Sequence, residues 1–301
     1  MEGALRGLVL GLCAVGLATR AEAAFEAPPP DPAALALGGS LGWPGAGRVA
    51  CGGVALFDEC APPQLRLAAL QWAEAPELQR QGVALSYPLR GLEIGVSGER
   101  LAVAGYSEAI GLLAVARPVA ESGWGGGVGV GLARWGPPGA GTTVVPLVVQ
   151  IGAAPRAGLH LGDSLRTAVG PGARRLEERL EAGLTWDAAP GWRLGGGCEA
   201  RAAGTRVRAA LECRPGPGLA LRGAFTPGDG ASAFGVGVTL GGIVLELAQS
   251  RHPRLGALLA AGLSLRWGRG KAGTAAAPGA EPPASPDSIE PGASSGTGGG
   301  R

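Results

Sequence analysis

Residues that could carry out catalysis are few in this chain and stand apart from one another. The sequence contains two histidines, His160 in Leu159–Asp163 and His252 in a Ser-Arg-His-Pro segment, and we expect both to be solvated loop residues. Neither belongs to a Ser/His/Asp or paired-carboxylate arrangement of the kind that hydrolases use. The glycines of 125–129 lack the lysine and the following helix of a phosphate-binding loop. The sequence therefore predicts no enzyme activity, no catalytic residue, no cofactor and no metal site.

Charged residues of another kind occur singly, at alternate positions of otherwise apolar or glycine-rich segments. Isolated charges in this setting predict a polar face on each segment, turned away from an apolar one. Because both signs occur, these side chains could pair with one another and seal an interior rather than select an ion. The residues that we expect to line such an interior are Glu93, Glu181, Glu199, Arg208, Glu212, Arg222, Glu246 and Arg266.

The elements that carry these charges show a period of two. In Ser232–Ser250, apolar residues such as Phe234 and Val236 alternate with tiny or polar ones, and the alternation resumes after Gly241-Gly242. This period is typical of a β-strand with one apolar face, and Gly-Gly suits a two-residue hairpin turn.

Similar segments recur about every dozen residues from Gly82 to Trp267, with longer interruptions near 136–142 and 155–178. We therefore expect about twelve to fourteen strands, including one or two before Gly82. The apolar stripes include Val83–Leu89, Leu92–Val96, Ile110–Ala114, Val128–Leu132, Leu180–Trp186 and Leu259–Trp267.

The composition decides what kind of β-protein this is. Glycine contributes 57 residues, only 17% of residues are charged, and the mean hydropathy is +0.21. A soluble sandwich has strands with a bulky inner face and a charged outer face. Here one face of the strands is bulky and the opposite face carries Gly, Ala, Ser, Thr and single charges, as in a transmembrane barrel. The fold class predicted is all-β: a transmembrane antiparallel β-barrel with apolar residues facing lipid. A secreted β-sandwich or solenoid is the alternative.

Aromatic residues fall near the ends of the expected strands, where they could form interfacial girdles. They are Tyr87, Trp135, Trp186, Trp192, Phe225, Phe234 and Trp267.

The ends of the chain differ from the barrel in composition. Residues 1–23 resemble an export signal with an apolar run too short to span a bilayer, although a membrane anchor is an alternative. Residues 24–79 form an N-terminal segment, in which Gln64–Ala75 is either a helical plug or a first strand. Residues 80–268 form the barrel, and 269–301 a disordered Pro/Ala/Gly tail. We therefore expect export to the bacterial outer membrane, with its lipid as a partner.

Four cysteines follow the signal: Cys51, Cys60, Cys198 and Cys213. An oxidising compartment favours disulfides, Cys51 with Cys60 across a short loop and Cys198 with Cys213 across a hairpin. The alternative for Cys198 and Cys213 is two small apolar residues on the lipid face. No spacing resembles a CxxC metal or redox pair.

Several glycine-spaced motifs resemble PorV/PorQ-type outer-membrane barrels, within the wider group similar to the fatty-acid transporter FadL. Leu211–Phe225 is similar to a "GxEyr" strand, short turn and "LaLRaGy" run, and Gly235–Ala248 to "GlGl…g.l.ldyA". The resemblance covers about residues 80 to 267. It implies either a pore or transporter for small or hydrophobic molecules, or a scaffold or adaptor bound to an envelope protein partner. A net charge of +2 gives no basis for nucleic-acid binding.

Overall fold

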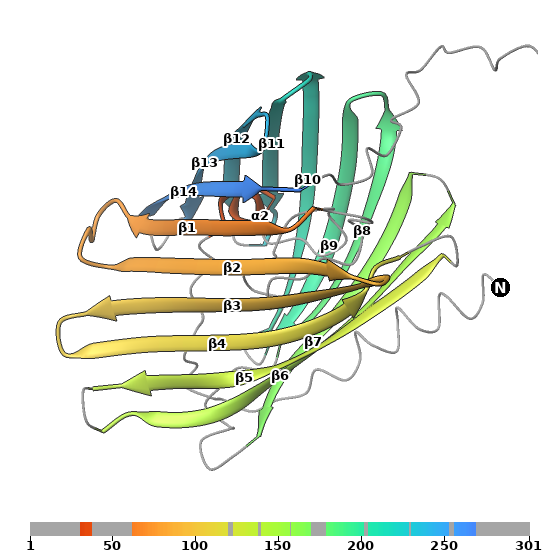
Figure 1. Cartoon of the computed structure of the whole chain (residues 1–301). Helices are drawn as coiled ribbons and strands as arrows, with labels where there is room; N and C mark the ends of the chain where they lie inside the picture. Colours follow the sequence, from red (N-terminus) through yellow and green to blue (C-terminus); the bar gives the residue numbers. More distant parts are fainter. Residues whose placement is uncertain are drawn as a thin grey trace, which may run out of the picture. The chain divides into compact units, whose positions relative to one another are not determined.

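The computed structural model describes residues 31–37, 62–119, 123–137, 140–156, 158–169, 179–201, 204–228, 230–252 and 256–268. The expected signal segment, Cys51, Cys60 and the C-terminal tail lie outside these residues. The described residues form a closed barrel of fourteen antiparallel strands, in which each strand pairs with its neighbours in sequence and β1 pairs with β14 (Figure 1). The predicted all-β barrel is confirmed, at the upper end of the expected strand number, and a sandwich or solenoid is excluded.

The strands are β1 (Gln64–Trp72), β2 (Gln79–Leu89), β3 (Leu92–Val103), β4 (Tyr106–Arg117), β5 (Trp124–Gly136), β6 (Thr142–Arg156), β7 (Leu159–Val169), β8 (Arg179–Ala189), β9 (Trp192–Arg201), β10 (Gly204–Gly216), β11 (Leu219–Thr226), β12 (Ala231–Leu240), β13 (Ile243–His252) and β14 (Gly256–Arg266). A short helix, α2 (Pro32–Ala36), contacts β11 to β14 from the inside. No helix in the described part of the chain is long and apolar enough to cross a membrane.

The hairpin expected within Ser232–Ser250 is present. Leu240 pairs with Ile243 across Gly241-Gly242. Gly241 has a φ of 59°, a backbone conformation that the first central position of a type II′ turn requires. The alternating pattern and the glycine pair therefore fix both the strands and their register here.

Gln64–Trp72 is the first strand, one of the two alternatives that the sequence leaves open for this segment. It pairs with β14 along its whole length, so the barrel wall begins before the expected boundary at residue 80. The expected interruption at 155–178 contains the strand β7. Leu161 and Leu165 lie on one face of this strand, but Asp163 lies between them on the same face and weakens the alternation of apolar and polar residues.

The outer face is apolar and the inner face mostly polar. Outward residues such as Leu67, Val96 and Val128 are exposed, Val128 by 63%, whereas their inward neighbours Arg66 and Ser97 are buried. The bulky stripe thus faces outward and the charges face inward, as the pattern predicts.

The inner face of β4 to β6 is an exception, because apolar side chains predominate there, although Glu108 and Gln150 also face inward. Ile110 and Leu112, expected on the outer face, turn inward and pack with Trp135, Val144 and Val148. The expectation was wrong because both faces of β4 carry apolar residues, and Leu113 and Val115 occupy the outer one. The alternation of the sequence therefore does not show which face of β4 points into the barrel. Trp135 is buried in this cluster and is not an interfacial residue.

The other expected interfacial aromatics are exposed on the outer face. They are Tyr87, Trp186, Trp192, Phe225, Phe234 and Trp267, and Trp124 joins them.

The two ends of the barrel differ in their connections. The end at which β1 begins and β14 finishes, here the terminal end, carries two-residue connections at 90–91, 157–158, 190–191, 217–218 and 241–242, with one longer connection at 118–123. The opposite end, here the loop end, carries longer connections at 73–78, 137–141, 170–178, 227–230 and 253–255, and two-residue connections at 104–105 and 202–203.

Replacement by alanine should have very different effects on stability at two glycines of the wall, because the neighbouring strand is close to only one of them. A Cβ at Gly131 would fall on the carbonyl oxygen of Gly111, whereas the nearest heavy atom to a Cβ at Gly98 is Val83 Cγ1 at 3.7 Å. We expect Gly131→Ala to lower the free energy of unfolding by about 1–3 kcal/mol, as forced overpacking does. The control, Gly98→Ala, should change it little; urea unfolding in detergent measures both, and equal effects would contradict this account of the wall.

Candidate functional site

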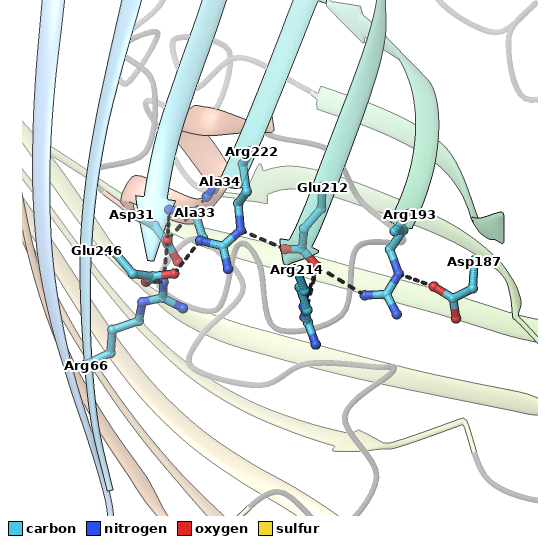
Figure 2. A network of polar contacts seen from close by, with 10 residues as sticks. All are labelled: Asp31, Ala33, Ala34, Arg66, Asp187, Arg193, Glu212, Arg214, Arg222 and Glu246. Carbon is cyan, nitrogen blue, oxygen red and sulfur yellow. Dashed lines mark hydrogen bonds and ion pairs between the residues drawn. The ribbon is translucent and has the colours of Figure 1, made fainter. Parts of the chain in front are cut away.

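Alternating charges run across the inner faces of β8 to β11 (Figure 2). Arg193 Nε lies 2.6 Å from Asp187 Oδ1 and Arg193 Nη1 lies 3.8 Å from Glu212 Oε1. Glu212 also accepts hydrogen bonds from Arg214 at 2.9 Å and from Arg222 at 2.8 Å. Each acid here is therefore neutralised by an arginine on its own or a neighbouring strand.

The series continues onto β13 and β1 and ends at α2. Arg222 Nη1 donates to Glu246 Oε1 at 2.8 Å, and Glu246 also accepts from Arg66. Arg66 Nη2 lies 2.8 Å from Asp31 Oδ1, and both side chains are almost fully buried. The wall charges thus hold the N-terminus of a helix inside the barrel (Figure 2).

The register explains why these residues meet. Glu212 stands directly opposite Arg193 of β9 and Arg222 of β11, and residues directly opposed on neighbouring strands share a face. On β12 the residues opposite Arg222 and Glu246 are Gly235 and Gly237. A Cβ at Gly237 would lie 3.1 Å from Arg222 Nη1, so the glycine leaves the space through which Arg222 reaches Glu246.

The helix α2 occupies a seat that is also made of glycine. Asp31 caps the helix by accepting hydrogen bonds from the backbone N–H of Ala33 at 3.0 Å and of Ala34 at 3.3 Å. Burial raises the pKa of the Asp31 carboxyl, and the Arg66 guanidinium opposes that rise. A Cβ at Gly262 would lie 2.9 Å from Pro32, and a Cβ at Gly235 would lie 2.6 Å from that of Ala36. Inward glycines therefore permit the helix to lie against the wall.

A second cluster surrounds Glu199 on β9. Arg179, Arg201 and Arg208 form ion pairs with its carboxylate, and Glu181 lies 3.3 Å from Arg179. Glu199 is 1% exposed, so three cations share one deeply buried anion.

His160 is not a loop residue. It lies on the inner face of β7, with Nε2 3.9 Å from Asp187 Oδ2, at the end of the charged series that begins with Arg193. The prediction was wrong because the short pattern around Gly162 concealed a strand.

The eight residues singled out by pattern all lie on inner-face positions. Glu212, Arg222 and Glu246 belong to the first series, and Glu181, Glu199 and Arg208 to the Glu199 cluster. Glu93 is buried on β3, and Arg266 lies at the end of β14 opposite Gln64.

Sequence reasoning missed several members of these clusters. Arg66 has the same pattern as the eight predicted residues, a single charge between two apolar residues, Leu65 and Leu67, and could have been found in the same way. Asp31 carries a different signal: an Asp followed by Pro marks a helix start. The other missed members are Arg179, Asp187, Arg193, Arg201 and Arg214.

The two described cysteines do not face each other. Cys198 stands opposite Val207 and Cys213 opposite Trp192, six residues apart along β9 or about 20 Å. A disulfide needs Cα atoms within about 7 Å. Both cysteines share the parity of the exposed Val207 and Leu221, so they lie on the outer face as small apolar residues.

A cavity of about 440 Å³, here the vestibule, lies inside the barrel next to the β10–β11 turn at the terminal end. Glu246, Ala33 and Leu37 lie on its wall, and its basic lining residues are Arg66, Arg193, Arg214, Arg222 and Arg266. Within the described residues no group of three metal-ligating side chains occurs. Guanidinium groups are the most frequent polar groups in the lining of the vestibule.

No family model matches the chain, and no curated protein matches its sequence. Among solved structures, it is similar to the KdgM porin, with a TM-score of 0.41, 8% identity, and coverage of 68% of this chain and 99% of that one. It is also similar to a mutant porin of Rh. blastica, with a TM-score of 0.38, 8% identity and coverage of 68% and 99%. Likeness at this level does not extend to substrate or activity.

The Glu199 cluster yields a prediction about stability. Glu199→Gln leaves three arginines without their shared anion, and we expect a loss of about 3 kcal/mol, in the range for breaking a buried pair. Glu181→Gln is the control, because Glu181 contacts only Arg179 of the three and is more exposed. Urea unfolding of both variants in detergent measures the difference; a Glu199→Gln barrel as stable as the control would show that the cluster does not hold the wall.

Proposed function

We propose that this chain is a transmembrane β-barrel of the bacterial outer membrane that provides a route for small molecules. The observation that carries the proposal is the sidedness of the closed wall: exposed leucines and valines outside, and buried ion pairs inside. Such an outer face is favourable in hydrocarbon, and a closed barrel presents no unpaired edge to lipid.

The asymmetry of the two ends supports an orientation. Outer-membrane barrels have short periplasmic turns and longer external loops. Five of the six connections at the terminal end have two residues, against two of the seven at the loop end, so the terminal end suits the periplasm. Exposed Tyr87, Trp124, Trp186, Trp192 and Trp267 lie near that end, as an interfacial belt would.

The chemistry of the vestibule favours small anionic solutes over hydrophobic ones. Its five arginines exceed by one the four acids that lie beside them, Asp31, Asp187, Glu212 and Glu246, so the vestibule keeps an excess of positive charge. Guanidinium groups recognise carboxylate and phosphate in a bidentate manner. The proposed function is thus a non-catalytic pore or transporter with a preference for anions.

A second candidate, a sealed scaffold or adaptor in an envelope complex, is favoured by α2. The helix is buried inside the barrel, against β11 to β14, and the Asp31–Arg66–Glu246 series holds it there. A barrel occupied in this way could serve as a docking platform of the PorV-like kind, with an envelope protein as partner.

If the outer face lies in a membrane, a charged substitution on it should destabilise the barrel more at the middle of the bilayer than at its edge. Val130 lies in the middle of β5 and Leu240 at the end of β12, and both are exposed. In liposomes, Val130→Arg should destabilise the barrel by about 2–4 kcal/mol and the control Leu240→Arg by about 0–1 kcal/mol. Denaturant unfolding in liposomes measures both values; a Val130→Arg variant that is monodisperse in buffer without detergent would sink the membrane proposal.

Release of α2 predicts a change in conductance. Asp31→Ala removes the helix cap and the ion pair with Arg66, and a cap alone contributes about 1 kcal/mol. We expect single channels in planar bilayers to be open at least several-fold more often than in the unaltered protein. The control is Asp163→Ala, the same truncation on the outer face of β7. If neither the unaltered barrel nor Asp31→Ala conducts, transport is contradicted and the scaffold is favoured.

A further inference from the structure

The outer face has an apolar groove where the first and last strands meet. It has a volume of about 750 Å³ and lies over β14, β1, β2 and β3, which are neighbours in the closed sheet (Figure 1). Its outward-facing floor consists of small residues, Ala69, Gly98 and Ala261. Leu67, Val83 and Leu263 form its bulkier sides. A groove of this kind accommodates a slender apolar chain.

The groove becomes polar toward the loop end. Gln81 and Arg100 line it there and stand directly opposite each other on β2 and β3. The same row continues through Ala109 to Arg134, so two arginines lie two strands apart, about 10 Å. Both are exposed, and neither forms an ion pair with an acid among the described residues. Cationic side chains thus stand at one end of an apolar channel.

We infer that this groove binds one anionic membrane lipid, with an acyl chain along Ala69 and Gly98 and its headgroup phosphate at Arg100 and Arg134. Guanidinium groups form strong, charge-assisted hydrogen bonds with phosphate, and the small floor lets a chain approach the backbone closely. The inference rests on the proposed membrane location but not on conduction.

A second copy of the chain fits this surface less well. A two-fold interface would bury the same patch on both copies, so Arg100 and Arg134 of each copy would need acidic partners within that patch. Within the described strands β13, β14 and β1 to β6, outward positions carry Arg100, Arg117, Arg134 and Arg251 but no Asp or Glu that could neutralise them. The charge therefore favours an anionic lipid.

Native mass spectrometry of the detergent-solubilised full-length protein can test the inference. Phosphatidylglycerol is the anionic probe and phosphatidylcholine the zwitterionic one, each titrated separately. Arg100→Gln removes the charge, with Arg117→Gln as the matched control at the terminal end of β4. Gly98→Leu fills the groove without a close Cβ contact, and its control is Gly223→Leu, an outward glycine whose Cβ would have Ala233 O as its nearest neighbour at 3.8 Å. Heat-modifiable migration on a gel checks that each variant is folded.

We expect one phosphatidylglycerol to bind in preference to phosphatidylcholine. Arg100→Gln should weaken this binding about fivefold, equivalent to about 1 kcal/mol for one arginine near a membrane surface. Gly98→Leu should abolish it, and both controls should bind as the unaltered protein does. Equal binding by all variants, equal losses in the controls, or a dimer that Gly98→Leu converts to a monomer would each overturn the inference. A barrel that binds the lipid but does not conduct would overturn only the transport function.

Discussion

The structure depends on one geometric constraint: directly opposed residues on neighbouring antiparallel strands point to the same face of the sheet. In a closed barrel this rule extends around the wall, so inward charges on neighbouring strands can be placed directly opposite one another. Arg193, Glu212 and Arg222 satisfy it directly, because each opposes the next across β9, β10 and β11. The same rule sends Leu194, Leu211 and Leu221 outward together, so ion pairing inside and aliphatic packing outside result from a single register.

Glycine on the inner face has a specific role in this arrangement. At Gly237 it lets a long arginine cross one strand to reach its partner, and at Gly262 it provides room for Pro32. A side chain at either position would compete with the ion pair or with the helix. Glycine at these inner positions thus makes room in the lumen both for a long side chain and for a segment of the chain's own N-terminal region.

The sequence predicted the barrel, the approximate strand number and the inward charges, because each rests on a local period of two. It failed where that period is ambiguous. Both faces of β4 are apolar, so Ile110 and Leu113 cannot be assigned to a side without the register. The pairing of Asp31 with Arg66 and Glu246 joins three distant segments, and no local pattern specifies which arginine a distant carboxylate reaches. Cys198 and Cys213 have the same parity, but their separation along the hairpin follows from the position of the turn.

Closure by β1 and β14 has a consequence for biogenesis. The nine-residue register from Gln64–Arg266 to Trp72–Leu258 joins positions at opposite ends of the barrel sequence. Contacts of such large sequence separation form late, because loop closure costs entropy before the pairing is gained. Until β14 has been synthesised and delivered, β1 and the latest strand both present open hydrogen-bonding edges that invite aggregation. We therefore expect the wall to close only after β14 has been synthesised, and the open edges of the earlier strands to be the part of the chain most prone to aggregation before then.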